Sequence, residues 1–156
     1  MNTGLHVGLE PPDQPDVVAL IEALDAYQKP LYPIESHYGV DLATLMQPNV
    51  LFAVARNAEG RALGCAGLML LADYAEVKRM YVDPACRGRG IARALLDLLE
   101  RLALERGLGL LRLETGNRQP EALGLYRRQG FVLRGPFGDY PDDPNSLFME
   151  KQLRRA

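Results

Sequence analysis

The chain has 156 residues, of which 47% are hydrophobic and 24% charged, and its formal net charge is −2. This length suits one domain over residues 1–156, large enough to fold without a disulfide or a structural metal. The charge disfavours nucleic acid as a partner, because domains that bind it are usually strongly basic. No apolar run approaches the roughly 20 residues that a bilayer crossing needs, and no secretory signal is apparent at the start. We therefore expect a cytoplasmic protein that binds neither nucleic acid nor membrane.

The cysteines and histidines do not form a pattern of metal ligands. Cys65 and Cys86 do not make a CxxC pair, and His6 and His37 are isolated in the sequence. We therefore expect no metal site. In a reducing compartment both thiols are expected to be free.

The first half of the chain predicts a strand, a helix and then a run of strands. Alternating apolar residues favour the strands, and Pro15 in a first turn, with Asp13 or Gln14 as the cap, favours the helix. The expected elements are a strand over 5–9, a helix from Pro15, a structured loop over 29–39, a short helix capped by Asp41 and ending near Pro48, a hairpin of 50–55 and 63–71, and a strand over 76–82.

The second half predicts an amphipathic helix followed by strand, helix and strands. The helix carries an apolar stripe opposite an expected Asp97–Arg101 ion pair, and Gly107 is suited to end it. The stripe consists of Ile91, Leu95, Leu98, Leu99 and Leu102. The later elements are a strand over 108–115, a helix from Pro120 to Gly130, a strand over 131–133, a loop over 135–145 and a strand over 147–153. This order indicates an α+β fold with a mixed central sheet rather than a doubly wound parallel one.

The most informative segment is the turn between the strand ending at Val82 and the amphipathic helix. Gly88 and Gly90 allow a tight turn and a close approach of a ligand to the backbone amides. Free N–H groups and the helix dipole, about +0.5 charge, attract anions at such a start. Cationic side chains lie in the same stretch, at Arg87, Arg89 and Arg93. The segment predicts a cradle for a phosphate or diphosphate.

Other interpretations of this turn are a capped helix without a ligand, a dinucleotide-binding fingerprint and a Walker A loop. The dinucleotide fingerprint needs a third glycine where this chain has Arg93, and the Walker A loop needs a GK[ST] that does not follow.

The segment Arg87-Gly88-Arg89-Gly90-Ile91-Ala92 resembles the [Q/R]-x-x-G-x-[G/A] signature of the GNAT acyltransferase superfamily. Tyr126, Gly130 and Phe131 match the end of a later helix in that family, and the order of elements is the same. The resemblance, to a small bacterial-type acyl-CoA-dependent acetyltransferase, covers roughly residues 50–151. It implies a mostly antiparallel sheet whose fourth and fifth strands splay apart around acetyl-CoA, used as co-substrate without a metal.

By this resemblance, the backbone of Met80, Tyr81 and Val82 would pair with the pantetheine arm, and the amides from Arg87 to Ala92 would hold the diphosphate. Many family members have an asparagine seven residues before the tyrosine that matches Tyr126, where this chain has Gln119. The site residues expected to bind CoA are therefore Met80, Tyr81, Val82, Arg87, Gly88, Arg89, Gly90, Ile91, Ala92, Arg93 and Gln119.

The resemblance implies direct attack of a primary amine on the thioester. Glu76 is the candidate general base, directly or through water, and Tyr126 is the candidate acid for the departing thiolate. Lys78 lies on the same face of the strand as Glu76, so an alternative is that Glu76 only pairs with it. Tyr126 could likewise be a packing residue.

Loops around the splayed strands are expected to hold the acceptor. Tyr32, Glu35, Glu114 and Tyr140 offer carboxylates and aromatic rings that suit a small cationic amine. Asp142 and Asp143 are interpreted as solvated turn residues. Alternatives to a small-molecule acetyltransferase are a CoA-binding module without catalysis and an enzyme that acylates a protein amine. Either a monomer or a homodimer is compatible with the sequence.

Overall fold

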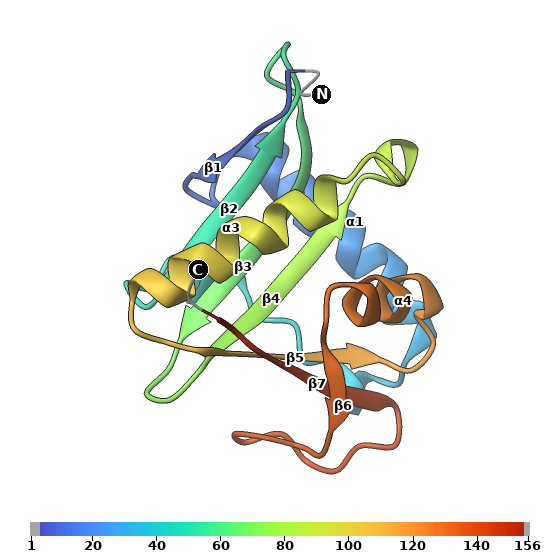
Figure 1. The fold of residues 1–156 in the computed structure, drawn as a ribbon. Helices are drawn as coiled ribbons and strands as arrows, with labels where there is room; N and C mark the ends of the chain where they lie inside the picture. Colours follow the sequence, from blue (N-terminus) through green and yellow to red (C-terminus); the bar gives the residue numbers. More distant parts are fainter. Residues whose placement is uncertain (1–3, 155–156) are drawn as a thin grey trace.

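A computed structural model describes residues 4–154, and its central feature is a seven-stranded sheet (Figure 1). The strands are β1 (His6–Leu9), β2 (Val50–Arg56), β3 (Ala62–Leu70), β4 (Ala75–Val82), β5 (Leu110–Gly116), β6 (Val132–Arg134) and β7 (Ser146–Gln152). Across the sheet they are ordered β1-β2-β3-β4-β5-β7-β6. Only β4 and β5 pair in parallel, and the other neighbours are antiparallel. The predicted α+β fold with a mixed, mostly antiparallel sheet is confirmed.

Helices cover both faces of the sheet. They are α1 (Pro15–Gln28), α2 (Leu42–Leu45), α3 (Ile91–Glu105) and α4 (Pro120–Arg128), with 3₁₀ turns at residues 29–31, 34–36 and 84–86. α3 and α4 share one buried apolar cluster with the sheet, and α1 packs into a second cluster on the opposite face (Figure 1). Within the described chain, no helix combines the length and apolar content that a bilayer crossing requires.

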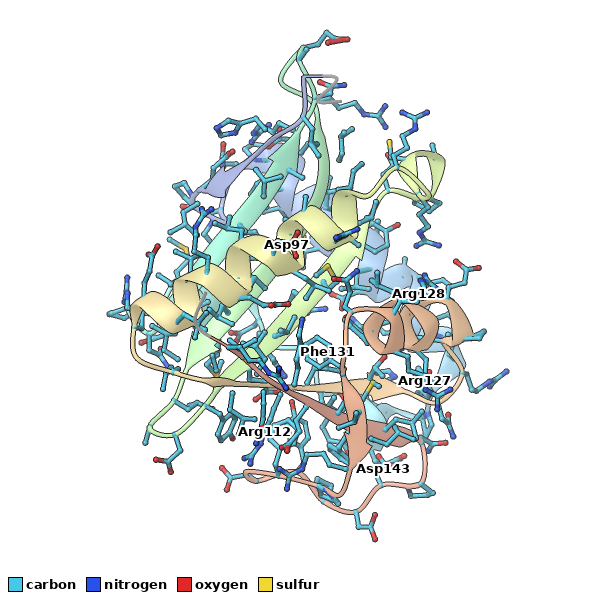
Figure 2. All side chains as sticks on the ribbon, in the orientation of Figure 1. Asp97, Arg112, Arg127, Arg128, Phe131 and Asp143 are labelled. Atoms are coloured by element: carbon cyan, nitrogen blue, oxygen red, sulfur yellow. The ribbon has the colours of Figure 1, made fainter. Side chains whose placement is uncertain are left out.

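The predicted apolar stripe of α3 faces the sheet. Leu95 and Leu99 are fully buried, and Leu96 between them is buried as well. Asp97 lies on the solvent side (Figure 2), but its partner is Arg93 at 4.0 Å rather than Arg101, so that predicted pair is wrong. Exposed i,i+4 pairs are worth only a few tenths of a kcal/mol, so several pairings along one face compete closely.

The predicted helix starts are largely correct. Gln14 occupies the N-cap of α1, ahead of Pro15, although its side chain bonds to Glu10 and the Pro11 carbonyl instead of capping the helix. Asp41 caps α2 by accepting a hydrogen bond from the Thr44 amide at 2.9 Å. This short helix ends at Leu45 rather than near Pro48.

The parallel strands β4 and β5 stay together for two residues of each strand. The paired positions are Ala75 with Leu111 and Glu76 with Arg112, after which the strands separate. Close to this point the pairing of β3 with β4 shifts register, and Arg79 takes a left-handed conformation with φ of 57°. Such a conformation costs a non-glycine residue about 1–3 kcal/mol. The structure therefore has to hold Arg79 in place.

Contacts to the Arg79 side chain supply that restraint. Its guanidinium donates to the Asp25 carboxylate of α1 at 2.5 Å and to the Val40 carbonyl at 3.0 Å. The Arg79 side chain is only 8% exposed, so its charge depends on Asp25 for compensation. The ion pair ties the irregular part of β4 to α1.

We expect Asp25→Ala to destabilise the fold by about 3 kcal/mol, because it leaves the buried Arg79 charge unpaired. Urea unfolding measures this, and Glu22→Ala on the exposed side of α1 is the matched control. Equal midpoints for the two variants would show that the Asp25–Arg79 pair does not hold β4.

Candidate active site

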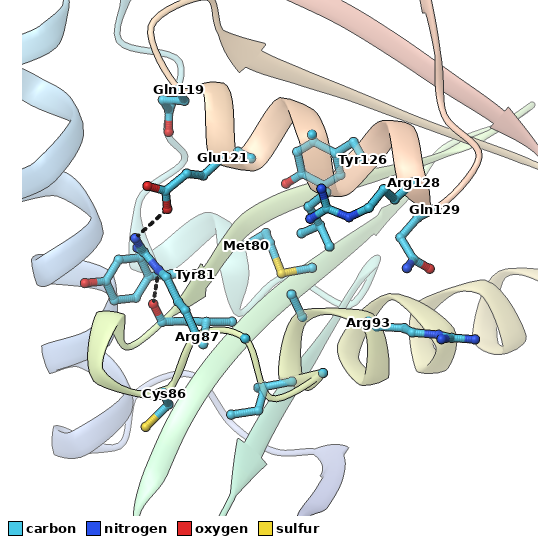
Figure 3. Close-up of a pocket in the computed structure, with 18 of the residues that line it drawn as sticks. Met80, Tyr81, Cys86, Arg87, Arg93, Gln119, Glu121, Tyr126, Arg128 and Gln129 are labelled. Atoms are coloured by element: carbon cyan, nitrogen blue, oxygen red, sulfur yellow. Dashed lines mark hydrogen bonds and ion pairs between the residues drawn. The ribbon is translucent and has the colours of Figure 1, made fainter.

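A cavity of about 850 Å³ lies between the end of β4, the start of α3, and α4 (Figure 3). It lies beyond the last paired residues of β4 and β5. The predicted CoA-binding residues that line it are Met80, Tyr81, Val82, Arg87, Gly88, Gly90, Ile91, Ala92, Arg93 and Gln119, and Tyr126 lines it too. Arg89 is exposed and does not line it. Residues that are distant in sequence thus meet where the two strands part.

The turn before α3 leaves its backbone amides free. Gly88 and Gly90 have φ of 81° and 79°, and a Cβ on either would meet no atom within 4 Å. Over the described chain, the amides of residues 88–93 donate no hydrogen bond to protein atoms, and no side chain caps α3. A helix of 15 residues with an open N-terminus is a strong anion site. The Arg87 amide differs, because it donates to the Pro84 carbonyl at 3.4 Å.

The Arg87 side chain reaches across the mouth of this cavity (Figure 3). It donates to the Val82 carbonyl and to the Glu121 carboxylate, both at 3.3 Å. Because the Glu121 side chain is 82% exposed, this ion pair is weak. An anion at the cradle can therefore compete for the Arg87 charge.

Tyr126 points from α4 into the cavity toward Met80 of β4 (Figure 3). Its hydroxyl makes no hydrogen bond to the described residues, and its ring packs against Phe131 with centroids 5.6 Å apart. Burial, and secondly the charge of Glu114, raise the pKa of Tyr126 well above its usual value. The phenol therefore stays protonated at neutral pH, as a proton donor must.

Gln119 lies at the N-cap of α4 and is buried at 7% exposure. Its side-chain carbonyl accepts from Gln28 at 3.1 Å, and its amide donates to the Tyr32 hydroxyl at 3.4 Å. It lies at the cavity as expected, but its amide group already has protein partners.

The opposite face of the sheet carries a buried polar network around Glu76. The Tyr140 hydroxyl donates to Glu76 Oε2 at 2.5 Å and accepts from Lys78 at 2.7 Å. Lys78 also lies 3.4 Å from Glu76, so the predicted pairing of these two residues is present. Burial, followed by the charge of Glu76, raises the pKa of Tyr140. Catalysis by Glu76 stays a prediction.

Glu114 lies on the same face, on β5. Its Oε2 accepts a hydrogen bond from Ser146 at 2.7 Å. Desolvation is the main cause that raises the pKa of Glu114, against the lowering effect of that hydrogen bond and of Lys78. A half-buried carboxylate whose pKa is raised is suited to accept a proton.

Of the other predicted acceptor-binding residues, Tyr32 and Tyr140 close over this face. The Tyr32 hydroxyl accepts from the Arg118 amide at 3.0 Å and covers Gly116, where a Cβ would clash with the Tyr32 ring. Tyr140 packs edge-to-face against Tyr38 and Phe148. Glu35 is exposed in the 3₁₀ turn over residues 34–36, apart from this network.

The sequence-based interpretation of Asp143 as a solvated turn residue is wrong. Its carboxylate accepts hydrogen bonds from Ser36 and Tyr38, each at 2.6 Å, and so joins the loop near residue 140 to the loop after α1. These two bonds are the main cause that lowers the pKa of Asp143. More than a hundred residues of chain separate the partners, so no local pattern signals the contact. Both cysteines are free, as expected, and both are buried.

The sequence and the fold both match one known family. The model of the acetyltransferase (GNAT) family matches residues 19–131. The chain belongs to the GNAT acetyltransferase family. It is therefore an N-acetyltransferase by family, in agreement with the resemblance of the turn before α3.

Three relatives illustrate the match. The IAA acetyltransferase of Azospirillum brasilense is 49% identical over 149 residues, covering 94% of this chain and 97% of that protein. The crystal structure of a proposed acyl-CoA N-acyltransferase from Klebsiella pneumoniae has a TM-score of 0.86 at 38% identity, covering 98% of this chain and 100% of that one. The PaiA N-acetyltransferase of Thermoplasma acidophilum, solved with coenzyme A, has a TM-score of 0.73 at 18% identity, covering 95% and 98%, and shows the shared fold.

We expect Asp143→Asn to lower the melting temperature at pH 7. The hydrogen bonds depress the pKa of Asp143, so its carboxylate stabilises the fold above the ordinary value of 3.8 and loses that effect as the pH falls below it. Thermal unfolding across pH checks this, because the difference from wild type should shrink only in acid. Asp142→Asn, at the exposed neighbouring position, should match wild type throughout. A difference that persists in acid would contradict the assignment.

Proposed function

We propose that this enzyme transfers an acetyl group from acetyl-CoA to a primary amine of a small molecule, by direct attack in a ternary complex. The observation that carries the proposal is the row of free amides over residues 88–93, at one end of a cavity that Tyr126 borders.

The groups that line the cavity suit successive parts of the CoA molecule. The amides of residues 88–93 would hold the diphosphate, with Arg87 and Arg93 nearby as cations. Among the described residues, the edge of β4 from Met80 to Val82 has no strand partner on the β5 side. Apart from the Val82 carbonyl, which accepts from Arg87, its backbone would be available to the pantetheine arm, as in strand addition. Gln119 would contact the same arm. When bound, acetyl-CoA supplies the thioester carbonyl that the amine attacks.

Residues of this chain would transfer the protons and stabilise the charge that develops on the carbonyl oxygen. Tyr126 donates its proton to the departing sulfur, and a backbone N–H near Met80 or Tyr81 stabilises charge on the carbonyl oxygen. The proton of the acceptor ammonium passes to a carboxylate on the opposite face, where Glu76 and Glu114 lie. Glu76, directly or through water, was the sequence-based candidate.

A small acceptor is favoured over a protein amine because side chains cover the face of the sheet that carries Glu76 and Glu114, which we call the acceptor face. Tyr32 lies over Gly116, and Tyr140 is held between Glu76 and Lys78. A peptide segment would need an open groove in their place. The Azospirillum brasilense relative is named for IAA as its acceptor, which also supports a small substrate. The carboxylates and aromatic rings of this region favour an acceptor with a positive charge.

Arg87→Glu combined with Gly90→Asp should abolish CoA binding, since it places two negative charges at the proposed diphosphate site. Calorimetric titration with CoA measures this. Arg106→Glu with Gly107→Asp is the matched control, because it makes the same changes at the other end of α3, where Gly107 also has a positive φ of 76°. Unchanged affinity in the Arg87/Gly90 variant would remove the cradle from the proposal.

Tyr126→Phe should lower turnover by about 10²-fold or more, because it removes the proposed acid and keeps the ring that packs on Phe131. The affinity for CoA should stay near that of wild type. Thiol release measured with acetyl-CoA and a panel of amines gives the rate, and calorimetry gives the affinity. Full turnover in this variant would make Tyr126 a packing residue.

A further inference from the structure

Glu76 on β4 and Glu114 on β5 lie on the same face of the sheet, at different heights along the two strands. Glu76 pairs in register with Arg112, at the last level where β4 and β5 are together. Side chains of a strand alternate between faces, and Leu111 and Leu113 pack toward α3, so Glu114 shares the face of Arg112. Glu114 is two residues further along and thus lies where the strands have already parted.

The Glu76 carboxylate is bonded to Tyr140 and lies beside Lys78. Its Oε2 accepts the Tyr140 proton at 2.5 Å and lies 3.4 Å from the Lys78 ammonium. Its side chain is 7% exposed, which leaves little room for an acceptor molecule. Glu76 Oε1, like Oε1 of Glu114, has no hydrogen-bond partner among residues 4–154, so the two carboxylates differ in burial, Glu76 being buried and Glu114 half-buried.

Glu114 is more accessible than Glu76. Its Oε2 accepts from Ser146 at 2.7 Å, whereas its Oε1 has no hydrogen-bond partner over residues 4–154. The described residues contain no fully buried side-chain oxygen without a partner, so Oε1 must be accessible. Burial, and secondly the charge of Glu114, raise the pKa of Tyr126, the proposed acid.

We propose that Glu114 is the general base of the reaction and that Glu76 is a positioning residue for Lys78 and Tyr140. Glu114 Oε1 takes one proton from the acceptor ammonium, and the freed nitrogen lone pair forms the C–N bond to the acetyl carbon. The C–S bond breaks with its electron pair on sulfur, which takes the Tyr126 proton. Solvent then takes the second proton from the new amide nitrogen and the proton from Glu114, and returns one to Tyr126, so that one proton is released overall.

The surroundings of Glu114 agree with this role. Desolvation and the carboxylates of Glu76 and Asp143 raise its pKa, and Ser146 and Lys78 lower it. Behind larger causes, which are the hydrogen bond to Asp143 for Tyr38 and burial for the other two, the charge of Glu114 also raises the pKa of Tyr38, Tyr126 and Tyr140. A carboxylate whose pKa is raised, together with a phenol that stays protonated, is the pair of groups that this reaction needs.

The inference rests on the proposed function, so the experiment tests both. Thiol release from acetyl-CoA is followed across pH with spermidine, lysine and tryptamine, and the best acceptor is used for every variant. We expect Glu114→Gln to lower kcat by about 10²-fold or more and to remove the rise of rate with pH. We expect Glu76→Gln to keep that rise, and Glu105→Gln, an exposed change on α3, to match wild type.

Ser146→Ala provides a second test that keeps both carboxylates. Removing the hydroxyl takes away a hydrogen bond that lowers the pKa of Glu114, so the rise of rate should move to higher pH. This variant decides the matter even if Glu114→Gln fails to fold, which circular dichroism would reveal.

The outcomes separate the two ideas. If wild type releases no thiol with any of the amines, the proposed function fails and the inference fails with it. If wild type is active and either the Glu114→Gln profile or the Ser146→Ala profile superimposes on that of wild type, the inference alone is wrong. If Glu76→Gln instead loses the pH dependence, the general base is Glu76.

Discussion

The parting of two parallel strands is the constraint on which the rest of the structure depends. β4 and β5 share a single short stretch of pairing, ending at Glu76 and Arg112. Beyond it lie the edge of β4 that does not pair with β5 and a cavity between β4, α3 and α4. The irregular backbone at Arg79 accompanies this parting, and the buried ion pair to Asp25 holds that backbone in a conformation it would otherwise avoid.

The two faces of the sheet beside the parted strands differ in charge. On the α3 side, free amides and arginines favour an anion, and the only charged competitor bonded to Arg87 in the described chain is the exposed Glu121. On the other side, Glu76, Glu114 and Asp143 lie with Lys78 among aromatic rings, and Arg112 on the same face is paired with Glu150. We infer that an anionic donor and a cationic acceptor enter from opposite faces, which keeps each from occupying the other's site.

Features governed by local sequence were predictable. The apolar stripe of α3, the glycines before it and the Asp41 cap each act within a few residues, so periodicity and capping rules found them. The contacts of Tyr140 with Glu76 and of Asp143 with Tyr38 join residues 64 and 105 positions apart. These contacts depend on how loops cross the finished sheet. The left-handed backbone conformation of Arg79 could not be predicted either, because sequence rules assign that conformation to glycine.

The most direct test of this view is a ¹⁵N-labelled amide NMR titration with CoA. If the open start of α3 receives the diphosphate, the largest shift changes will fall on the amides of residues 88–93, with smaller ones along the free edge of β4. Binding that leaves these amides unmoved and perturbs another surface would contradict the assignment of the cradle, and with it the direction from which the donor enters.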